Sequence, residues 1–192
     1  ANNEYNDASG GNKWDINYLG TSVADGQFQF GAIGGKILSG RETGEDIFLS
    51  DFALGFNTSS DPKKDSSGFE YAIRLMGVDN KGNANFKLLS GGTWSGANLY
   101  DRDRHKTMTY RMDDDAATVG LFTGKWANNG TDKNVLEASF DLNWLSLFDL
   151  DQGGRLSTYL TMACVNDEAM VHADIAPVPL PAAVWLLSPA LI

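Results

Sequence analysis

Phe69-Glu-Tyr-Ala-Ile-Arg-Leu-Met76 carries the clearest structural signal in the chain. Apolar side chains occupy every second position, namely Phe69, Tyr71, Ile73 and Leu75. Alternation with a period of two is typical of a strand that buries one face. A polar loop over residues 57–68 precedes this strand and a turn at residues 79–82 follows it, so we expect a short strand in an antiparallel sheet.

Other stretches show the same alternation or a short apolar run. They cover residues 14–19, 27–33, 36–39, 46–56, 85–89, 107–112, 118–123, 135–140 and 155–162. Asp25-Gly26 indicates a tight turn between the first two. One helix is expected over residues 141–148, where Asp141 can cap the first turn and Leu142, Leu145 and Phe148 share a face.

About ten short strands separated by turn signals predict an all-β fold, an antiparallel β-sandwich of the jelly-roll kind. A chain of 192 residues suits one such domain. We expect a flexible N-terminal arm over residues 1–12, the sandwich over residues 13–175, and a proline-rich apolar tail over residues 176–192.

The composition narrows the class of protein. The formal net charge is -10 and the pI is about 4.5, which disfavours nucleic acid as a partner because its binding needs a basic surface. Cys164 is the single cysteine, so an intramolecular disulfide is excluded. Ala1 suits a chain whose N-terminal signal peptide has been removed, and we expect an exported protein.

The tail differs from everything before it. Pro177, Pro179 and Pro181 precede an almost purely apolar run that contains Val184-Trp-Leu-Leu187. An exposed run of this kind must be covered by a membrane, by another subunit or by the chain's own core. In the last case the tail would be a C-terminal edge strand packed on its own domain.

Val178-Pro-Leu-Pro-Ala-Ala-Val-Trp-Leu-Leu187 resembles the start of the C-terminal sorting signal of bacterial PEP-CTERM proteins, in the variant that reads VPLPAAVWL. The resemblance implies processing by an exosortase, only transient contact with the membrane, and delivery to the cell surface or the extracellular matrix. Tyr159-Leu-Thr-Met-Ala-Cys-Val-Asn-Asp167 is similar to a Thr-Met-x-Cys-x-Asn-Asp stretch that precedes the signal in some of these proteins, which usually have Gly where Val165 stands. Neither resemblance implies an enzymatic activity.

The sorting signal is incomplete in this sequence. Leu180 stands where the Pro-Glu-Pro form has an acidic residue, and no Lys/Arg cluster follows the apolar run. The stretch from Pro181 to Ile192 is also shorter than the ~20 residues that a spanning helix needs. Pro189 would disturb a helix, so an extended strand suits the tail better.

Few residues suggest a site. Calcium is the best cofactor hypothesis, because it binds several oxygens at loop tips; the candidate ligands are Asp113, Asp114, Asp115, Asp149 and Asp151. Three adjacent acids also occur in ordinary solvated turns. His105 and His172 stand in no metal-binding motif, and no nucleophile or phosphate-binding motif is present. We therefore expect no enzymatic activity.

Two functions remain open. The first is a structural protein of the cell surface or matrix that forms homopolymeric filaments by donating its tail to a neighbouring subunit. The assembly residues would be Val184, Trp185, Leu186, Leu187 and Leu191. The second is a secreted lectin-like module, with or without Ca²⁺, in which Trp94 and Trp126 stack on an extracellular polysaccharide.

Overall fold

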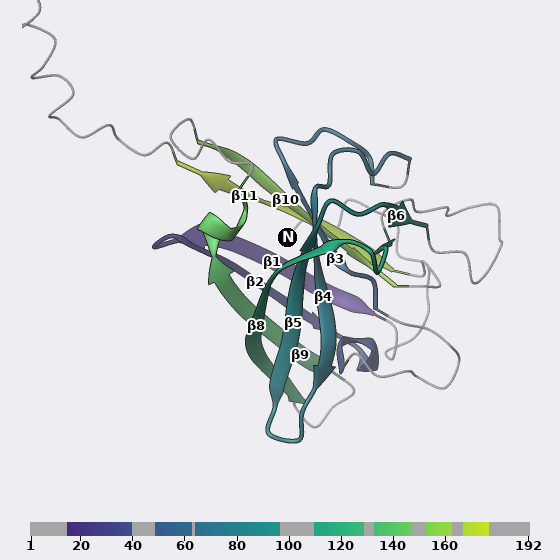
Figure 1. The fold of residues 1–192 in the computed structure, drawn as a ribbon. Helices are drawn as coiled ribbons and strands as arrows, with labels where there is room; N and C mark the ends of the chain where they lie inside the picture. The colour runs from purple at the N-terminus through teal and green to yellow at the C-terminus, as the bar shows by residue number, and fades with distance from the viewer. Residues whose placement is uncertain are drawn as a thin grey trace, which may run out of the picture.

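The computed structural model describes residues 15–39, 49–62, 64–96, 110–128, 133–146, 153–162 and 167–176, and most of them are β-strand (Figure 1). The predicted all-β class is confirmed. Nine strands form one antiparallel sheet: β1 (Ile16–Ala24), β2 (Gln27–Gly34), β3 (Phe52–Phe56), β4 (Tyr71–Val78), β5 (Asn83–Ser90), β8 (Ala117–Asn128), β9 (Asn134–Asp141), β10 (Gly154–Thr161) and β11 (Glu168–Ile175). Two short strands pair separately: β6 (Trp94–Ser95) and β7 (Arg111–Met112).

Short turns set the register of the first hairpins. Asp25 and Gly26 connect β1 to β2 with φ angles of 52° and 71°, the double positive φ that a two-residue hairpin turn needs. Between β4 and β5, the Asp79 carboxylate accepts hydrogen bonds from the backbone N–H groups of Lys81 and Asn83. Both turns were predicted from the sequence.

The sheet curls until its two edges meet. Its strand order is β1-β2-β9-β8-β5-β4-β3-β10-β11, and β1 lies against β11 (Figure 1). Every paired neighbour is antiparallel, so the first and the ninth strand point in the same direction. No backbone ladder joins β1 to β11 in the described ranges. The result is a nearly closed, barrel-like sheet with a parallel seam.

The inner face of the sheet is packed with aromatic side chains. Phe30 lies at the centre, with ring centroids 5.0 Å from Phe52 and 5.5 Å from Phe86. Phe122 stacks on Phe86 at 5.2 Å and contacts Phe140 at the same distance. These rings form one cluster with aliphatic side chains of most other strands of the sheet, and burial of such side chains supplies most of the stabilising free energy.

Part of the outer face is covered as well. Phe69 packs with Tyr159 of β10 and Met170 of β11 on this side. Met112 of β7 covers Leu89 of β5 in the same way. Phe69 was predicted to share a face with Tyr71, Ile73 and Leu75; it instead precedes β4, and its side chain lies in the outer cluster.

Three predictions about this architecture need revision. The strand order shows a single continuous sheet, so the division into two sheets of a sandwich is not seen. Residues 36–39 form a 3₁₀ turn, η1 (Lys36–Ser39), in place of a strand. The predicted helix is reduced to a second 3₁₀ turn, η2 (Leu142–Trp144); residues 147–150 lie outside the described part.

The tight turn at η2 has a packing reason. Asp141 caps it as predicted, accepting a hydrogen bond from the Asn143 N–H at 2.9 Å. Leu142 and Leu145, three residues apart, are both buried in the core, and Leu145 leaves helical geometry with φ -88° and ψ 80°. The three-residue repeat of a 3₁₀ turn matches this spacing.

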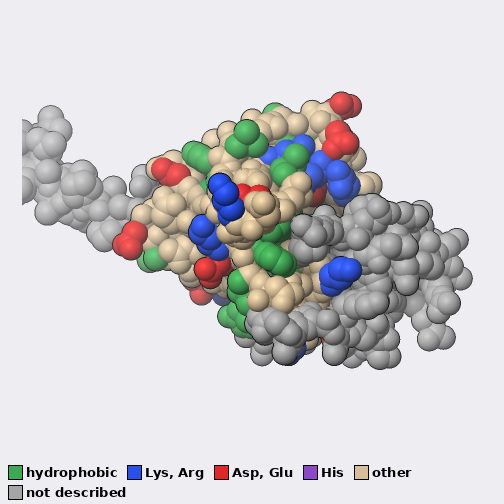
Figure 2. Space-filling model, turned by 90° about the horizontal axis from the view of Figure 1, so that it is seen from below, with side chains coloured by type: hydrophobic (Ala, Val, Ile, Leu, Met, Phe, Trp, Pro, Cys, Tyr) green, Lys and Arg blue, Asp and Glu red, His purple; other side chains and the backbone are tan. Residues whose placement is uncertain are grey.

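The described surface is mixed in charge. On the face shown in Figure 2, acidic and basic side chains are interspersed with small groups of apolar side chains. The negative net charge is therefore not gathered into one patch on the visible part of this face.

Candidate functional site

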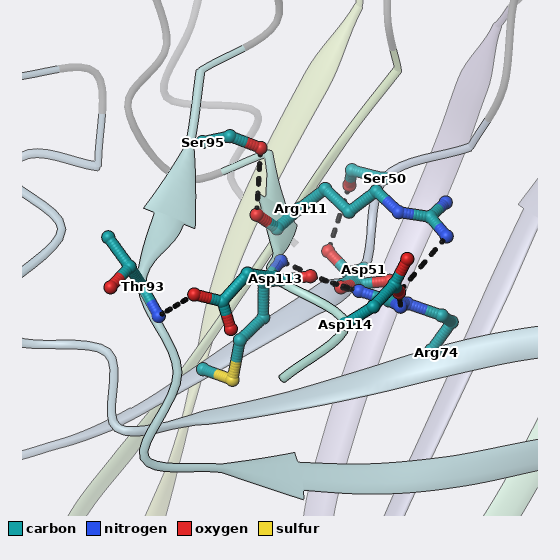
Figure 3. A network of polar contacts seen from close by, with 9 residues as sticks. Ser50, Asp51, Arg74, Thr93, Ser95, Arg111, Asp113 and Asp114 are labelled. Carbon is teal, nitrogen blue, oxygen red and sulfur yellow. Dashed lines mark hydrogen bonds and ion pairs between the residues drawn. The ribbon is translucent and has the colours of Figure 1, made fainter. Parts of the chain in front are cut away.

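Arg74 is the centre of a buried polar cluster (Figure 3). Strand alternation turns it to the outer face of β4, where only 4% of the residue is exposed. Its Nε and Nη2 donate to Oδ1 and Oδ2 of Asp51, both at 2.8 Å. Nη2 also donates to the Met112 carbonyl. Nη1 donates to the Asp114 carboxylate at 2.5 Å, so one guanidinium joins β4 to β7 and to residue 51.

Further hydrogen bonds hold the β6–β7 ladder in place. The Met112 N–H donates to Asp51 Oδ2 at 3.0 Å, and the Asp51 N–H donates to the Tyr110 carbonyl. Asp113 accepts a hydrogen bond from the Thr93 N–H at 3.1 Å (Figure 3). The acidic residues of this region therefore form hydrogen bonds that connect segments distant in sequence.

The charges in the cluster support each other. Burial alone would lower the pKa of Arg74, but hydrogen bonds and charge from Asp51, followed by those from Asp114, raise that pKa above its ordinary value. The hydrogen bond from Arg74 and its positive charge lower the pKa of Asp114 below 3.8. Both groups are thus held in their charged forms at neutral pH.

This geometry does not assemble the predicted calcium ligands. Asp114 is paired with Arg74 and Asp113 is bonded to Thr93, while Asp115 is exposed. No group of three potential ligands is found in the described ranges. Asp149 and Asp151 lie outside those ranges. A run of acids in sequence becomes a metal site only where its oxygens converge on one point, and here two of them point to protein donors.

The two tryptophans proposed to stack on sugars are both packed. Trp94 donates its indole N–H to the Phe69 carbonyl at 2.7 Å and contacts both outer clusters. Trp126 points inward and packs against the main core, where its indole N–H is buried without a partner in the described part. Trp94 belongs to β6 and Trp126 to β8.

A groove crosses the outer face of the sheet over β1, β2, β9 and β8. It encloses about 780 Å³. Gly20 and Gly31, which are cross-strand partners, form part of its floor. Its sides carry the polar and aromatic side chains of Tyr18, Ser22, Gln29, Thr123, Lys125, Glu137 and Ser139. None of these residues was predicted as part of a groove. The available signal is a glycine within one predicted strand, Gly31, and a glycine directly after another, Gly20.

For most of its length, β8 is hydrogen-bonded to a neighbouring strand on only one side. β8 pairs with β5 from Ala117 to Lys125, but with β9 only from Lys125 to Asn128. Beyond that point the two strands diverge. Trp144 fills the inner side of the fork, where it lies against Gly120 and the ring of Phe122.

The outer side of this fork exposes apolar side chains. Leu121 is 71% exposed and Val119 is 37% exposed. In the described part of the chain, no other strand pairs with residues 117–124 on the side that faces β9. The outer edge of β8 therefore offers a backbone edge and apolar side chains together.

Ser157 and His172 form the one serine–histidine pair in the described ranges. The Ser157 Oγ lies 2.9 Å from the His172 Nδ1, between directly paired positions of β10 and β11. Ser157 is completely buried. A hydroxyl without access from solvent cannot attack a substrate, so this pair stabilises the two strands.

Several sequence predictions fall outside the described ranges. They concern the arm over residues 1–12, Cys164, His105 and the tail residues Val184, Trp185, Leu186, Leu187 and Leu191. No described helix has the length and hydropathy of a membrane span. No family model, no curated protein and no solved structure shows significant similarity to this chain.

Proposed function

We propose that the protein is a non-enzymatic component of the bacterial cell surface or extracellular matrix that assembles with copies of itself. The open edge of β8 is the observation that carries this proposal. An edge strand with free backbone groups is a template for another strand. Natural assemblies use such edges by adding an extended segment of a neighbouring chain.

The tail has the composition of a donated strand. Val184 and Leu186 would be its apolar contacts, with Trp185 and Leu187 on the opposite side. The resemblance of residues 178–187 to an exosortase signal supports export to the surface, where such an assembly would act. Pro189 would limit pairing to the part of the tail that precedes it.

The apolar side chains along the β8 edge suit an apolar tail strand as their partner. Leu121 is exposed on β8, and Val119, two residues earlier, is exposed at a register shift of the β5–β8 ladder. A strand laid beside residues 117–123 would cover them and complete the hydrogen bonding of that edge. A contact between the tail of one subunit and the β8 edge of the next is heterologous, so its repetition gives an open filament.

Removal of residues 182–192 tests the proposal. We expect the full chain to form filaments visible by electron microscopy and the shortened chain to sediment as a monomer. Leu121→Lys should block assembly too, because a charge on an edge strand opposes pairing. Met76→Lys is the matched control, since Met76 is exposed (57%) but lies on β4. Unchanged assembly of both the shortened chain and Leu121→Lys would refute the proposal.

A further inference from the structure

The groove over β1, β2, β9 and β8 is a site of a different kind from the β8 edge. Its centre is a row of residues in direct register: Gly20 pairs with Gly31, Gly31 with Glu137, and Glu137 with Lys125. Neighbouring strands lie about 4.8 Å apart, so the row spans about 14 Å. Neither glycine carries a side chain of its own, so this end of the row is a shallow depression that only neighbouring side chains can cover.

An aromatic ring borders that depression. Tyr18 is 47% exposed, and its phenol end lies over Gly20, where a Cβ would be 2.7 Å from the hydroxyl oxygen. The ring thus presents an apolar face beside the groove and a hydroxyl inside it. This combination of a flat face and a polar tip suits ligands that are themselves both apolar and polar.

The remaining sides offer hydrogen-bond donors and acceptors. The Ser22 hydroxyl donates to the Gln29 Oε1 at 3.0 Å, so the amide N–H₂ of Gln29 remains available to a ligand. Lys125 donates to the Asn83 side chain at 2.9 Å. The Glu137 carboxylate has no hydrogen-bond partner in the described ranges and faces outward between these groups.

We propose that this groove binds a neutral polysaccharide chain. A sugar ring has an apolar face of C–H groups that can stack on Tyr18, and hydroxyls that can pair with Gln29 and Glu137. One lysine and one glutamate lie in the row, so the groove has no net charge and does not favour a polyanion. Its open shape across four strands admits a chain that continues beyond both ends.

The site extends the proposed function without depending on it. The contacts proposed for the ligand, Tyr18, Gln29 and Glu137, lie on β1, β2 and β9. The groove reaches the assembly edge of β8, residues 117–123, only at Thr123. A matrix protein with both surfaces would link its own assembly to the polymer around it. The polysaccharide site and the proposed assembly can be tested separately, because different variants disrupt each of them.

Affinity electrophoresis of the full chain in gels that contain a neutral glucan, a neutral mannan or alginate tests this site. We expect at least one neutral polymer to retard the protein and alginate to have no effect. Tyr18→Ala and Gln29→Ala should each weaken retardation about tenfold. Met76→Ala is the control for a lost exposed side chain on the same sheet, and equal melting temperatures show that the variants are folded.

Three results would overturn the inference. The first is no retardation in any neutral polymer. The second is binding that Tyr18→Ala and Gln29→Ala both leave unchanged. The third is binding to alginate alone that is lost in Lys125→Ala, which would show a polyanion site. Leu121→Lys should leave retardation unchanged, and Tyr18→Ala should leave assembly unchanged.

Discussion

The carboxylate of Asp167 accepts a hydrogen bond from the backbone N–H of Ile16 at 2.5 Å, and so joins the last strand of the sheet to the first. Its other oxygen accepts from the Glu168 N–H at 2.8 Å. Because nine antiparallel strands bring β1 and β11 together in parallel, the seam lacks the ladder that joins every other neighbouring pair. A buried side chain provides a hydrogen bond there instead.

Replacement of Asp167 by Ala should destabilise the protein by about 1–3 kcal/mol, since it leaves a buried N–H without an acceptor. Chemical denaturation gives the free energy of unfolding, and amide hydrogen exchange at Ile16 reports the seam directly. Asp174→Ala is the control, because Asp174 lies on β11, the strand that follows Asp167, but is exposed. Unchanged exchange at Ile16 in Asp167→Ala would show that the seam does not depend on this carboxylate.

Replacement of Arg74 should lower the free energy of unfolding more than replacement of Asp167 does. Asp51 is only 2% exposed, and in Arg74→Leu it keeps a buried charge without its partner, which costs about 3–5 kcal/mol. Urea denaturation should show this loss, and the double variant Arg74→Leu/Asp51→Leu should recover part of it. Arg111→Leu, which removes an exposed arginine 3.8 Å from Asp114, should have a small effect. Equal losses in both arginine variants would contradict this account.

Acid should weaken the contact between Arg74 and Asp114. The pKa of Asp114 lies below 3.8 in the folded chain because of the hydrogen bond from Arg74 and then its charge. The contribution is therefore fully present above the unfolded value and is lost as the pH falls through the lower folded value. The melting temperature of Asp114→Asn should lie below that of the wild type at pH 7, and the difference should vanish at low pH. A constant difference would argue against this linkage.

Glu70 should behave in the opposite way. Burial raises its pKa above 4.5, although hydrogen bonds from its own N–H and that of Phe56 act against this. A carboxyl with a raised folded pKa destabilises the protein above that pKa and ceases to do so as the pH falls through it. Glu70→Gln should therefore melt higher than the wild type at pH 7, with a difference that shrinks towards pH 4. Equal melting temperatures of Glu70→Gln and the wild type at pH 7 would contradict this account.

Alternation of apolar residues was sufficient to locate most strands. It placed strands within residues 27–33, 85–89 and 135–140, and all of them lie in the sheet. β11 was missed although Ala169, Val171, Ala173 and Ile175 alternate with polar residues and Met170. The apolar pair Ile37-Leu38 led to the prediction of a strand at residues 36–39. These residues form a 3₁₀ turn instead, and the Leu38 side chain is buried in the core.

The sequence by itself determined the class of fold, the hairpin turns at Asp25-Gly26 and Asp79, and the cap at Asp141, because these depend on a few neighbouring residues. Only the tertiary structure decided the closure of the sheet, the pairing of Asp114 with Arg74 and the row from Gly20 to Lys125. Each of these depends on which distant strands become neighbours. Such contacts are set by burial and register summed over the whole sheet, and no local pattern encodes them.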